Sequence, residues 1–312
     1  MTASSQSEAH RVWSTRDLLD WIEQHLAARE VDEPLLVARW LMAHAIGTDP
    51  IHLYTDLDRP ASEEERATLR ALVERASAHE PVQYLLGEGG FLGRMFEVGP
   101  GVLVPRTATE TLVQHVLTWH RGLDADARPD PLHIADIGTG SGCIGLTLAI
   151  HLPSALVVGV DCDEVAVAMA RRNCERHELG DRVSILQGDL CDALDAPVHV
   201  LVSNPPYIDD AHWDKLKPNV RSFEPSIALR GGVDGLDVIR RLISQASQHV
   251  LPGGLFVLET DDHHASTARD LLEATGEFDN CRVLRDEFGD DRFVTANRRG
   301  QAVRPDGSTC NA

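Results

Sequence analysis

The segment HIADIGTGSGCIGLTLAIHL, residues 133–152, carries the clearest indication of the fold. Its first residues have the length and apolar character of a buried strand, and its second half is typical of a helix. Between the two, Gly138, Gly140 and Gly142 allow the backbone to turn tightly and to approach a ligand closely. The segment therefore predicts a strand that passes through a glycine loop into a helix.

Downstream of this segment, apolar runs of strand length continue to alternate with helical patterns. The strand candidates are LVVGVD, VSILQGD, VHVLVSN and GLFVLETD, and the helical ones are DEVAVAMARRNCERHEL, LDVIRRLISQASQHV and HASTARDLLEATG. CRVLRDEFG and DRFVTANRR are typical of a closing pair of strands. Strands that alternate with helices imply a parallel sheet with right-handed crossovers, so we expect a Rossmann-like α/β fold.

Upstream, residues 14–80 are predicted to form an all-helical domain. Leu18, Leu19, Ile22 and Leu26 recur at helical spacing in its first segment. Three segments carry start signals: Ser14 or Thr15 as an N-cap, Pro34 at a first position with Gly47 as a stop, and Ser62 with Glu65 as a capping box. The glycines and prolines that follow predict a β-hairpin and linker.

These patterns divide the chain into five parts. We expect a disordered N-terminus over residues 1–10, a helical domain over 11–80, a β-hairpin linker over 81–106, a catalytic α/β domain over 107–300 and a disordered tail over 301–312.

Composition and charge narrow the range of functions. The 312 residues are 43% hydrophobic and carry a net charge of −20, which argues against broad binding of duplex nucleic acid. Six cysteines show no C-x-x-C pair, so we expect no metal site and a reducing compartment. The N-terminus has no apolar leader and the chain has no apolar run of about 18 residues, so we expect no membrane span and a cytoplasmic location. We also expect a monomer.

The glycine loop is compatible with two cofactors. Gly140–Gly145 matches the pattern G-x-G-x-x-G, and Asp161 ends the following strand, as in dinucleotide-binding proteins. NAD would place a pyrophosphate at the loop, whereas S-adenosylmethionine carries a sulfonium cation and no phosphate. Asp136, just before the loop, favours a cationic ligand, and Asp189 at the end of the third strand could accept a hydrogen bond from an adenine amino group.

A second motif, VSNPPY, ends the fourth strand of the same sheet. Asn204 is then expected at the carboxyl edge, beside the glycine loop, and Pro205 and Pro206 stiffen the turn. The Asn204 Oδ1 atom and the Pro205 carbonyl would provide two acceptors that grip an NH2 group, and Tyr207 offers a flat face for a planar amide or base. Such a grip would aim the nitrogen at an electrophilic methyl group.

ADIGTGSG, GVD, QGD and SNPPY, in this order and spacing, resemble class I S-adenosylmethionine-dependent methyltransferases of the NPPY group. EPVQYLLGEGGFLGRMFEVGPGVLVPRTATETLV, FEPSIALRGGVDGLDVIRRL and the ending DEFGDDRFVTANRR resemble the HemK-type protein-(glutamine-N5) methyltransferases, in particular the branch that acts on class 1 peptide chain release factors. The resemblance implies a seven-stranded, mostly parallel catalytic sheet, an N-terminal helical bundle that helps to recognise the protein substrate, and methylation of the glutamine in a Gly-Gly-Gln motif.

The resemblance also implies roles for individual residues. Those near the cofactor would be Gly138, Thr139, Gly140, Ser141, Gly142, Asp161 at the ribose, and Asp189 with Leu190 near adenine. Those that bind the glutamine amide would be Asn204, Pro205, Pro206 and Tyr207, with Phe91 and Arg106 near the cofactor or the substrate entrance. The chain departs from the family pattern at Gly89-Gly90, at Thr107-Ala108 and at Leu258-Glu259-Thr260, which puts the shape of the hairpin in question.

Three alternatives stay open at this stage. The same chemistry could act on a glutamine of a ribosomal protein, or on the exocyclic N6 of adenine in nucleic acid, which would need a basic face and base extrusion. A different class of protein, an NAD-dependent oxidoreductase or a nucleotide-binding protein without catalysis, would share the glycine loop.

Overall fold

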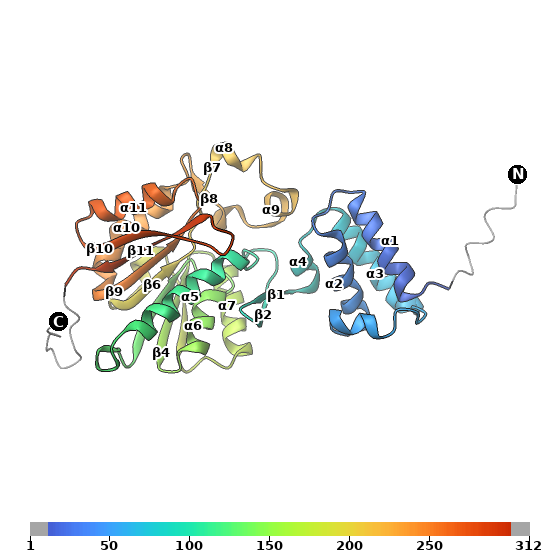
Figure 1. Ribbon diagram of the computed structural model, residues 1–312, viewed down its shortest axis with the longest axis horizontal. Coiled ribbons are helices and arrows are strands. Elements are labelled where there is room, and N and C mark those ends of the chain that lie inside the picture. Colours follow the sequence, from blue (N-terminus) through green and yellow to red (C-terminus); the bar gives the residue numbers. More distant parts are fainter. Residues whose placement is uncertain (1–11, 301–312) are drawn as a thin grey trace, which may run out of the picture. The chain divides into compact units, whose positions relative to one another are not determined.

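The computed structural model describes residues 12–300, so the predicted disordered ends at 1–10 and 301–312 lie outside the described residues. By their contacts the residues group into two compact units (Figure 1). Among the described residues, the first unit contains 12–87 together with Pro218–Phe223, and the second contains Glu88–Lys217 and 224–300.

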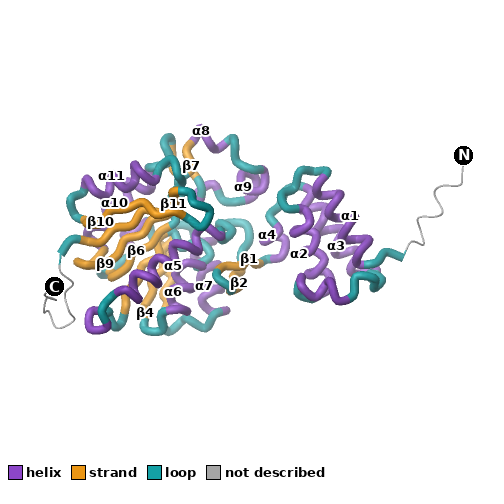
Figure 2. The backbone as a smooth tube through the Cα atoms, in the orientation of Figure 1, coloured by secondary structure: helices purple, strands orange, loops and turns teal. Residues whose placement is uncertain are grey.

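The first unit is helical (Figure 2), and its elements are α1 (Thr15–Ala27), α2 (Pro34–Ile46), the 3-10 helix η2 (Pro50–Thr55), α3 (Glu63–Ser77), α4 (Val82–Leu86) and α9 (Pro218–Phe223). The predicted start signals are confirmed, because Ser14 caps α1, Pro34 begins α2, and Ser62 with Glu65 forms a capping box on α3. Leu18, Leu19, Ile22 and Leu26 lie in the core of this unit, as their helical spacing predicted.

The short helix α4 differs from the prediction, which placed residues 82–86 in the hairpin and linker. Pro81 immediately precedes it, and Gly87 ends it in a left-handed conformation with φ of 76°. The helix forms because Leu85 joins the buried core made by α1, α2 and α3. The hairpin itself is shorter and consists of β1 (Glu88–Phe91) and β2 (Arg94–Glu97).

The second unit is built around a seven-stranded sheet in the order β10-β11-β9-β6-β3-β4-β5. Its strands are β3 (Leu132–Ile137), β4 (Ala155–Asp161), β5 (Val183–Gln187), β6 (Val198–Ser203), β9 (Val250–Glu259), β10 (Phe278–Arg285) and β11 (Asp291–Arg298). The five strands from β9 to β5 are parallel, and β11 pairs antiparallel with both β9 and β10. The predicted seven-stranded, mostly parallel sheet and its closing strand pair are therefore confirmed.

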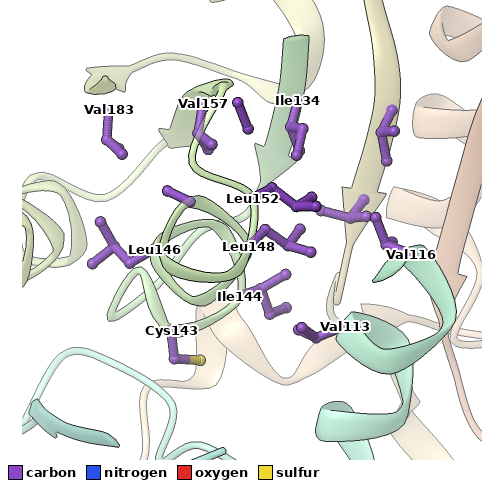
Figure 3. Close-up of a cluster of buried hydrophobic side chains, with 14 of the residues drawn as sticks. Val113, Val116, Ile134, Cys143, Ile144, Leu146, Leu148, Leu152, Val157 and Val183 are labelled. Carbon is purple, nitrogen blue, oxygen red and sulfur yellow. The ribbon is translucent and has the colours of Figure 1, made fainter. Parts of the chain in front are cut away.

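Helices cover both faces of this sheet. The helices of the second unit are α5 (Thr107–Gly122), α6 (Cys143–His151), α7 (Glu164–Arg176), α8 (Asp210–Trp213), α10 (Asp237–His249) and α11 (Ala265–Ala274), and a small pair of strands, β7 (Ile208–Asp209) and β8 (Arg230–Gly232), lies outside the sheet. Side chains of α5, α6 and α7 share one core with the sheet, part of which Figure 3 shows, and those of α10 and α11 share the other.

Consecutive strand residues alternate between these two cores, as the pleat of a strand requires. Ile134 and Val200 pack on the side of α5, α6 and α7, whereas Ala135 and Leu201 pack on the side of α10 and α11. The sheet is thus buried on both faces, and only the ends of its strands are open to a ligand. Among residues 12–300, none of the helices combines the length and the apolar character that crossing a bilayer requires.

Candidate active site

The candidate site lies where the direction of strand order reverses. From β3 the chain adds β4 and β5 on one side, and β6 and β9 lie on the other. Ile137, the last residue of β3, is the register partner of Ser203, the last residue of β6. The next residues, Gly138 and Asn204, are therefore neighbours, and a Cβ atom on Gly138 would lie 3.9 Å from the Asn204 carbonyl oxygen. In open α/β sheets, ligands bind at such a switch point.

The glycine loop between β3 and α6 depends on backbone conformations that other residues rarely adopt. Gly138, Gly140 and Gly142 have φ values of 72°, 55° and 84°. The amides of Gly138 and Thr139 both donate to the carbonyl of Val160 on β4, at 2.8 and 3.0 Å. These bonds draw the loop over the ends of two strands and leave its main chain facing the site.

Asp136 does not face a ligand, contrary to the expectation that it would lie beside a cationic group. Its side chain is fully buried, and its Oδ2 atom accepts hydrogen bonds from the Thr139 hydroxyl at 2.7 Å and the Gly145 amide at 2.9 Å. Burial raises the pKa of this carboxyl group to about 6. Asp136 therefore ties the glycine loop to the first turn of α6 from behind.

A cavity of about 290 Å³ opens at this edge of the sheet. Most of the predicted residues line it, namely Arg106, Gly138, Thr139, Gly140, Ser141, Asp161, Asp189, Leu190, Asn204, Pro205 and Pro206. Gly142, Tyr207 and Phe91 do not. The cavity therefore joins residues from the ends of β3, β4 and β6 and from the loop after β5.

The acids on the cavity wall hold different partners. Asp161 accepts hydrogen bonds from the Gly140 amide through Oδ2 at 2.9 Å and from the Asp163 amide through Oδ1 at 3.0 Å. Asp189 is paired with Arg241 of α10, whose Nη2 atom lies 2.5 Å from its Oδ2. Arg241 also lines the cavity and was missed in the sequence, because an arginine on a surface helix carries no local signal.

The Asn204-Pro205-Pro206 turn lines the cavity beside the glycine loop, but Tyr207 does not line it. The Asn204 Nδ2 atom donates to the hydroxyl oxygen of Thr109 at 3.3 Å. Tyr207 packs against the hydrophobic core on the α10 and α11 side, and this burial raises the pKa of its phenol. Tyr207 is partly buried against that core and is not among the residues that line the cavity, so the structure does not support its expected role as a stacking platform there.

Arg106 is held at the cavity by a residue that the sequence reasoning missed. Its Nη2 atom lies 2.5 Å from Oε1 of Glu224, whose side chain is completely buried. Glu224 also accepts a hydrogen bond from the Val104 amide at 3.2 Å. The segment FEPSIAL, residues 223–229, therefore holds the linker that carries Arg106. In the sequence analysis this segment contributed only to the family resemblance.

Phe91 does not reach the site. It ends β1 and is 1% exposed, and its ring packs edge-on against Phe96 with ring centres 6.3 Å apart. Both rings belong to the core beneath α5, α6 and α7. Phe91 therefore anchors the hairpin, because it points to the buried side of a strand that covers this core.

Two further polar residues lie behind Asn204. Thr109, in the first turn of α5, is 3% exposed, and Glu259, the last residue of β9, is 2% exposed. Burial raises the pKa of Glu259 to about 7, and interactions with the side chains of Thr109 and Asn204 oppose this rise. The signal in the sequence was Leu258-Glu259-Thr260, which we noted only as a departure from an apolar strand end.

Comparisons with known proteins cover almost the whole chain. A family described as "PrmC N-terminal domain" matches residues 17–87, and one described as "Methyltransferase small domain" matches residues 108–217. A "Release factor glutamine methyltransferase" from Geobacter sulfurreducens is 40% identical over 289 residues, which cover 92% of this chain and 98% of the relative. A protein of the same name from Rhodopirellula baltica is 37% identical over 288 residues, covering 92% and 97%. Among solved structures, the T. thermophilus 16S rRNA N2 G1207 methyltransferase aligns with 68% of this chain and 50% of its own, with 22% identity and a TM-score of 0.49.

Proposed function

This chain belongs to the release factor glutamine methyltransferase family, and from this premise we propose the reaction that it catalyses. It transfers a methyl group from S-adenosylmethionine to the side-chain amide nitrogen, N5, of a glutamine in a peptide chain release factor. We place that glutamine in the Gly-Gly-Gln motif of the class 1 release factors, because two glycines without side chains let a peptide enter a narrow cavity.

The chemistry of the cavity wall suits S-adenosylmethionine better than NAD. Asp161, Asp163 and Asp189 line the cavity together with Arg106 and Arg241, and these arginines are paired with Glu224 and with Asp189, respectively. The carboxylates of Asp161 and Asp163 would repel a pyrophosphate but attract a sulfonium or ammonium group. Gly140 offers open space, since a Cβ atom there would meet no atom within 4 Å. We propose that residues 138–142 hold the methionine part, that Asp161 binds the ribose hydroxyls, and that Asp189 and Leu190 flank the adenine. When bound, S-adenosylmethionine supplies an electrophilic methyl group on a sulfonium cation.

The Asn204 turn would bind the substrate amide. Its Oδ1 atom and the Pro205 carbonyl oxygen accept the two N–H bonds of the glutamine NH2 group, which holds the nitrogen in one orientation. The nitrogen would form the new N–C bond as the bond between the methyl group and the sulfonium sulfur breaks, which leaves S-adenosylhomocysteine, and one N–H proton would go to solvent. Orientation of this kind can contribute roughly 7–11 kcal/mol to lowering a barrier.

One observation carries the proposal: the register pair Ile137 and Ser203. It places the glycine loop and the Asn204 turn on adjacent strands at the switch point, so the methyl donor and the acceptor amide would meet in one cavity. A turn that served only to end a strand would not need to line this cavity.

The decisive experiment is a methylation assay with a purified class 1 release factor and radiolabelled S-adenosylmethionine. We expect one methyl group on the Gly-Gly-Gln peptide, located by mass spectrometry, and none on a release factor whose motif glutamine is replaced by asparagine. Asn204→Ala should abolish transfer and leave the binding of S-adenosylhomocysteine, measured by calorimetry, largely intact. Label that appears only in ribosomal proteins or in duplex DNA would refute the release factor as substrate.

A further inference from the structure

A buried acid stands directly behind the side chain that would grip the substrate. β9 is the parallel neighbour of β6, and Leu258 is the register partner of Ser203, so Glu259 lies next to Asn204 at the same sheet edge. The Glu259 carboxylate interacts with the side chains of both Thr109 and Asn204. Its Oε2 atom is buried and has no hydrogen-bond partner within residues 12–300. Glu259 does not line the cavity, so it is placed to act on Asn204 and not on a ligand.

Cations from two other elements surround this acid. Arg292 of β11 and Arg106, just before α5, both favour the ionised form of Glu259 against its burial. Arg292 is close because its neighbour Phe293 is the register partner of Glu259. The buried carboxyl group is thus retained at an energetic cost, which is most often seen where a buried polar group has a specific task.

The hydrogen-bonding capacities of the three side chains determine the direction of their bonds. In its ionised form, which Arg106 and Arg292 favour, the Glu259 carboxyl group can only accept. A hydroxyl donates one bond and accepts others, and a carboxamide donates from nitrogen and accepts at oxygen. The Thr109 hydroxyl can therefore give its proton to Glu259 while its oxygen accepts from Asn204 Nδ2, at 3.3 Å. When the Asn204 Nδ2 atom faces Thr109 and Glu259, the Oδ1 atom of the same planar carboxamide faces away from them.

We propose that Glu259 and Thr109 are positioning residues, which hold the Asn204 carboxamide with Nδ2 toward themselves and Oδ1 toward the cavity. The inference rests on the proposed methyl transfer, because only an NH2 substrate needs an oxygen at this place. A reversed carboxamide would present its own NH2 group to the substrate NH2 group, and neither could accept.

The first test compares two variants of Glu259. Glu259→Met keeps the length of the side chain and removes the acceptor, so kcat for release factor methylation should fall roughly 10- to 100-fold. Glu259→Gln keeps an acceptor oxygen and should retain most of the wild-type kcat. S-adenosylhomocysteine should bind both variants as it binds the wild type, and Glu287→Gln, at an exposed turn, is the matched control. Normal turnover by Glu259→Met, an equal loss in Glu259→Gln, or loss of S-adenosylhomocysteine binding would each overturn the positioning role.

The second test uses Thr109. Thr109→Val removes the hydroxyl at nearly constant volume and should lower kcat as Glu259→Met does, while Thr109→Ser restores the hydroxyl and should restore the rate. Thr111→Val, two residues further along α5, is the control and should behave as the wild type. If Thr109→Ser stays as slow as Thr109→Val, the hydroxyl is not what matters and the proposal fails.

A measurement without substrate separates this proposal from the proposed function. In 15N-labelled protein, the side-chain NH2 resonance of Asn204, assigned by its loss in Asn204→Ala, should shift in Glu259→Met and keep its position in Glu287→Gln. If the wild type fails to methylate the release factor but this shift occurs, the function is wrong and the orientation of Asn204 stands. If the wild type is active and the resonance does not move, the orientation is wrong and the function stands.

Discussion

Asp161 shows how one side chain can serve both the loop and a ligand. Each of its two oxygens already accepts one backbone hydrogen bond, from Gly140 and from Asp163. A carboxylate offers about four acceptor positions, so capacity remains for hydroxyl groups in the cavity. The same contacts hold the glycine loop against β4. Asp161 should therefore stabilise the loop in the free protein and also contribute to ligand binding.

We therefore expect Asp161→Ala to weaken the binding of S-adenosylhomocysteine. The loss of hydrogen bonds to a charged group costs about 1.5–3 kcal/mol, which corresponds to a roughly 10- to 150-fold rise in Kd. Isothermal titration calorimetry measures this directly, with Asp181→Ala in an exposed turn as the control. An unchanged Kd would remove Asp161 from the ribose site.

Helix α6 begins in an unusual way. Its N-cap is Gly142, which has φ of 84° and provides no side-chain cap, so the helix start depends on the left-handed conformation of a glycine. A Cβ atom at this position would lie 2.8 Å from Leu146 Cδ1. Gly142 does not line the cavity, so the glycine is needed there for the helix start and not for contact with a ligand. Gly138 and Gly140, in contrast, line the cavity.

Gly142→Ala should accordingly lower the free energy of unfolding by at least about 1–2 kcal/mol, the cost of placing a side chain in the left-handed region. Urea denaturation measures the free energy of unfolding of this variant and of a control, Gly122→Ala. Gly122 lies at the end of α5, where a Cβ atom would meet nothing within 4 Å. The control should be as stable as the wild type or slightly more stable. Equal stabilities of the two variants would show that the glycine cap is not needed.

Within residues 12–300, burial raises the pKa values of three carboxyl groups, Asp136 to about 6, Glu259 to about 7, and Asp161. Such groups bind more protons in the folded state than in the unfolded one, so their contribution to stability is present at low pH and is lost as pH rises. Glu259 faces Tyr207, whose phenol has a pKa raised by burial, and the cations Arg106 and Arg292.

Comparing wild type with Glu259→Gln isolates one of these groups, because Asp136 and Asp161 are common to both. The ordinary pKa of glutamate is 4.5 and that of Glu259 is about 7, so wild type should lose stability relative to the variant over this interval. The expected loss is about 3 kcal/mol, at 1.36 kcal/mol per pKa unit, and the difference should level off above pH 7. Urea titrations from pH 4.5 to 8 give this difference, and a difference that does not change with pH would mean that Glu259 is not held as a buried acid.

Features that depend on neighbouring residues in the chain could be predicted from the sequence. The capping box at Ser62 and Glu65, the glycine loop and the order of strands and helices follow from local conformational preferences and periodicity. The positions of Asp161 and Asn204 could also be predicted, because parallel strands bring their carboxyl ends to one edge. For the same reason a single motif after β6 was enough to place the proposed amide site beside the glycine loop.

Features that depend on contacts between distant segments could not be predicted in this way. A pattern of apolar residues shows which side of an element is buried, but not what it meets. Phe91 was therefore expected near the cofactor or the substrate entrance and Tyr207 against the substrate amide, although Phe91 lies in one core and Tyr207 packs against the other. Glu224 and Glu259 reach the site from segments far along the chain, and a buried acid has no local sequence signature. Only the packing of β9 and α5 against the end of β6 brings Glu259 and Thr109 to Asn204, because side-chain proximity is a property of the folded sheet edge and not of the order of residues.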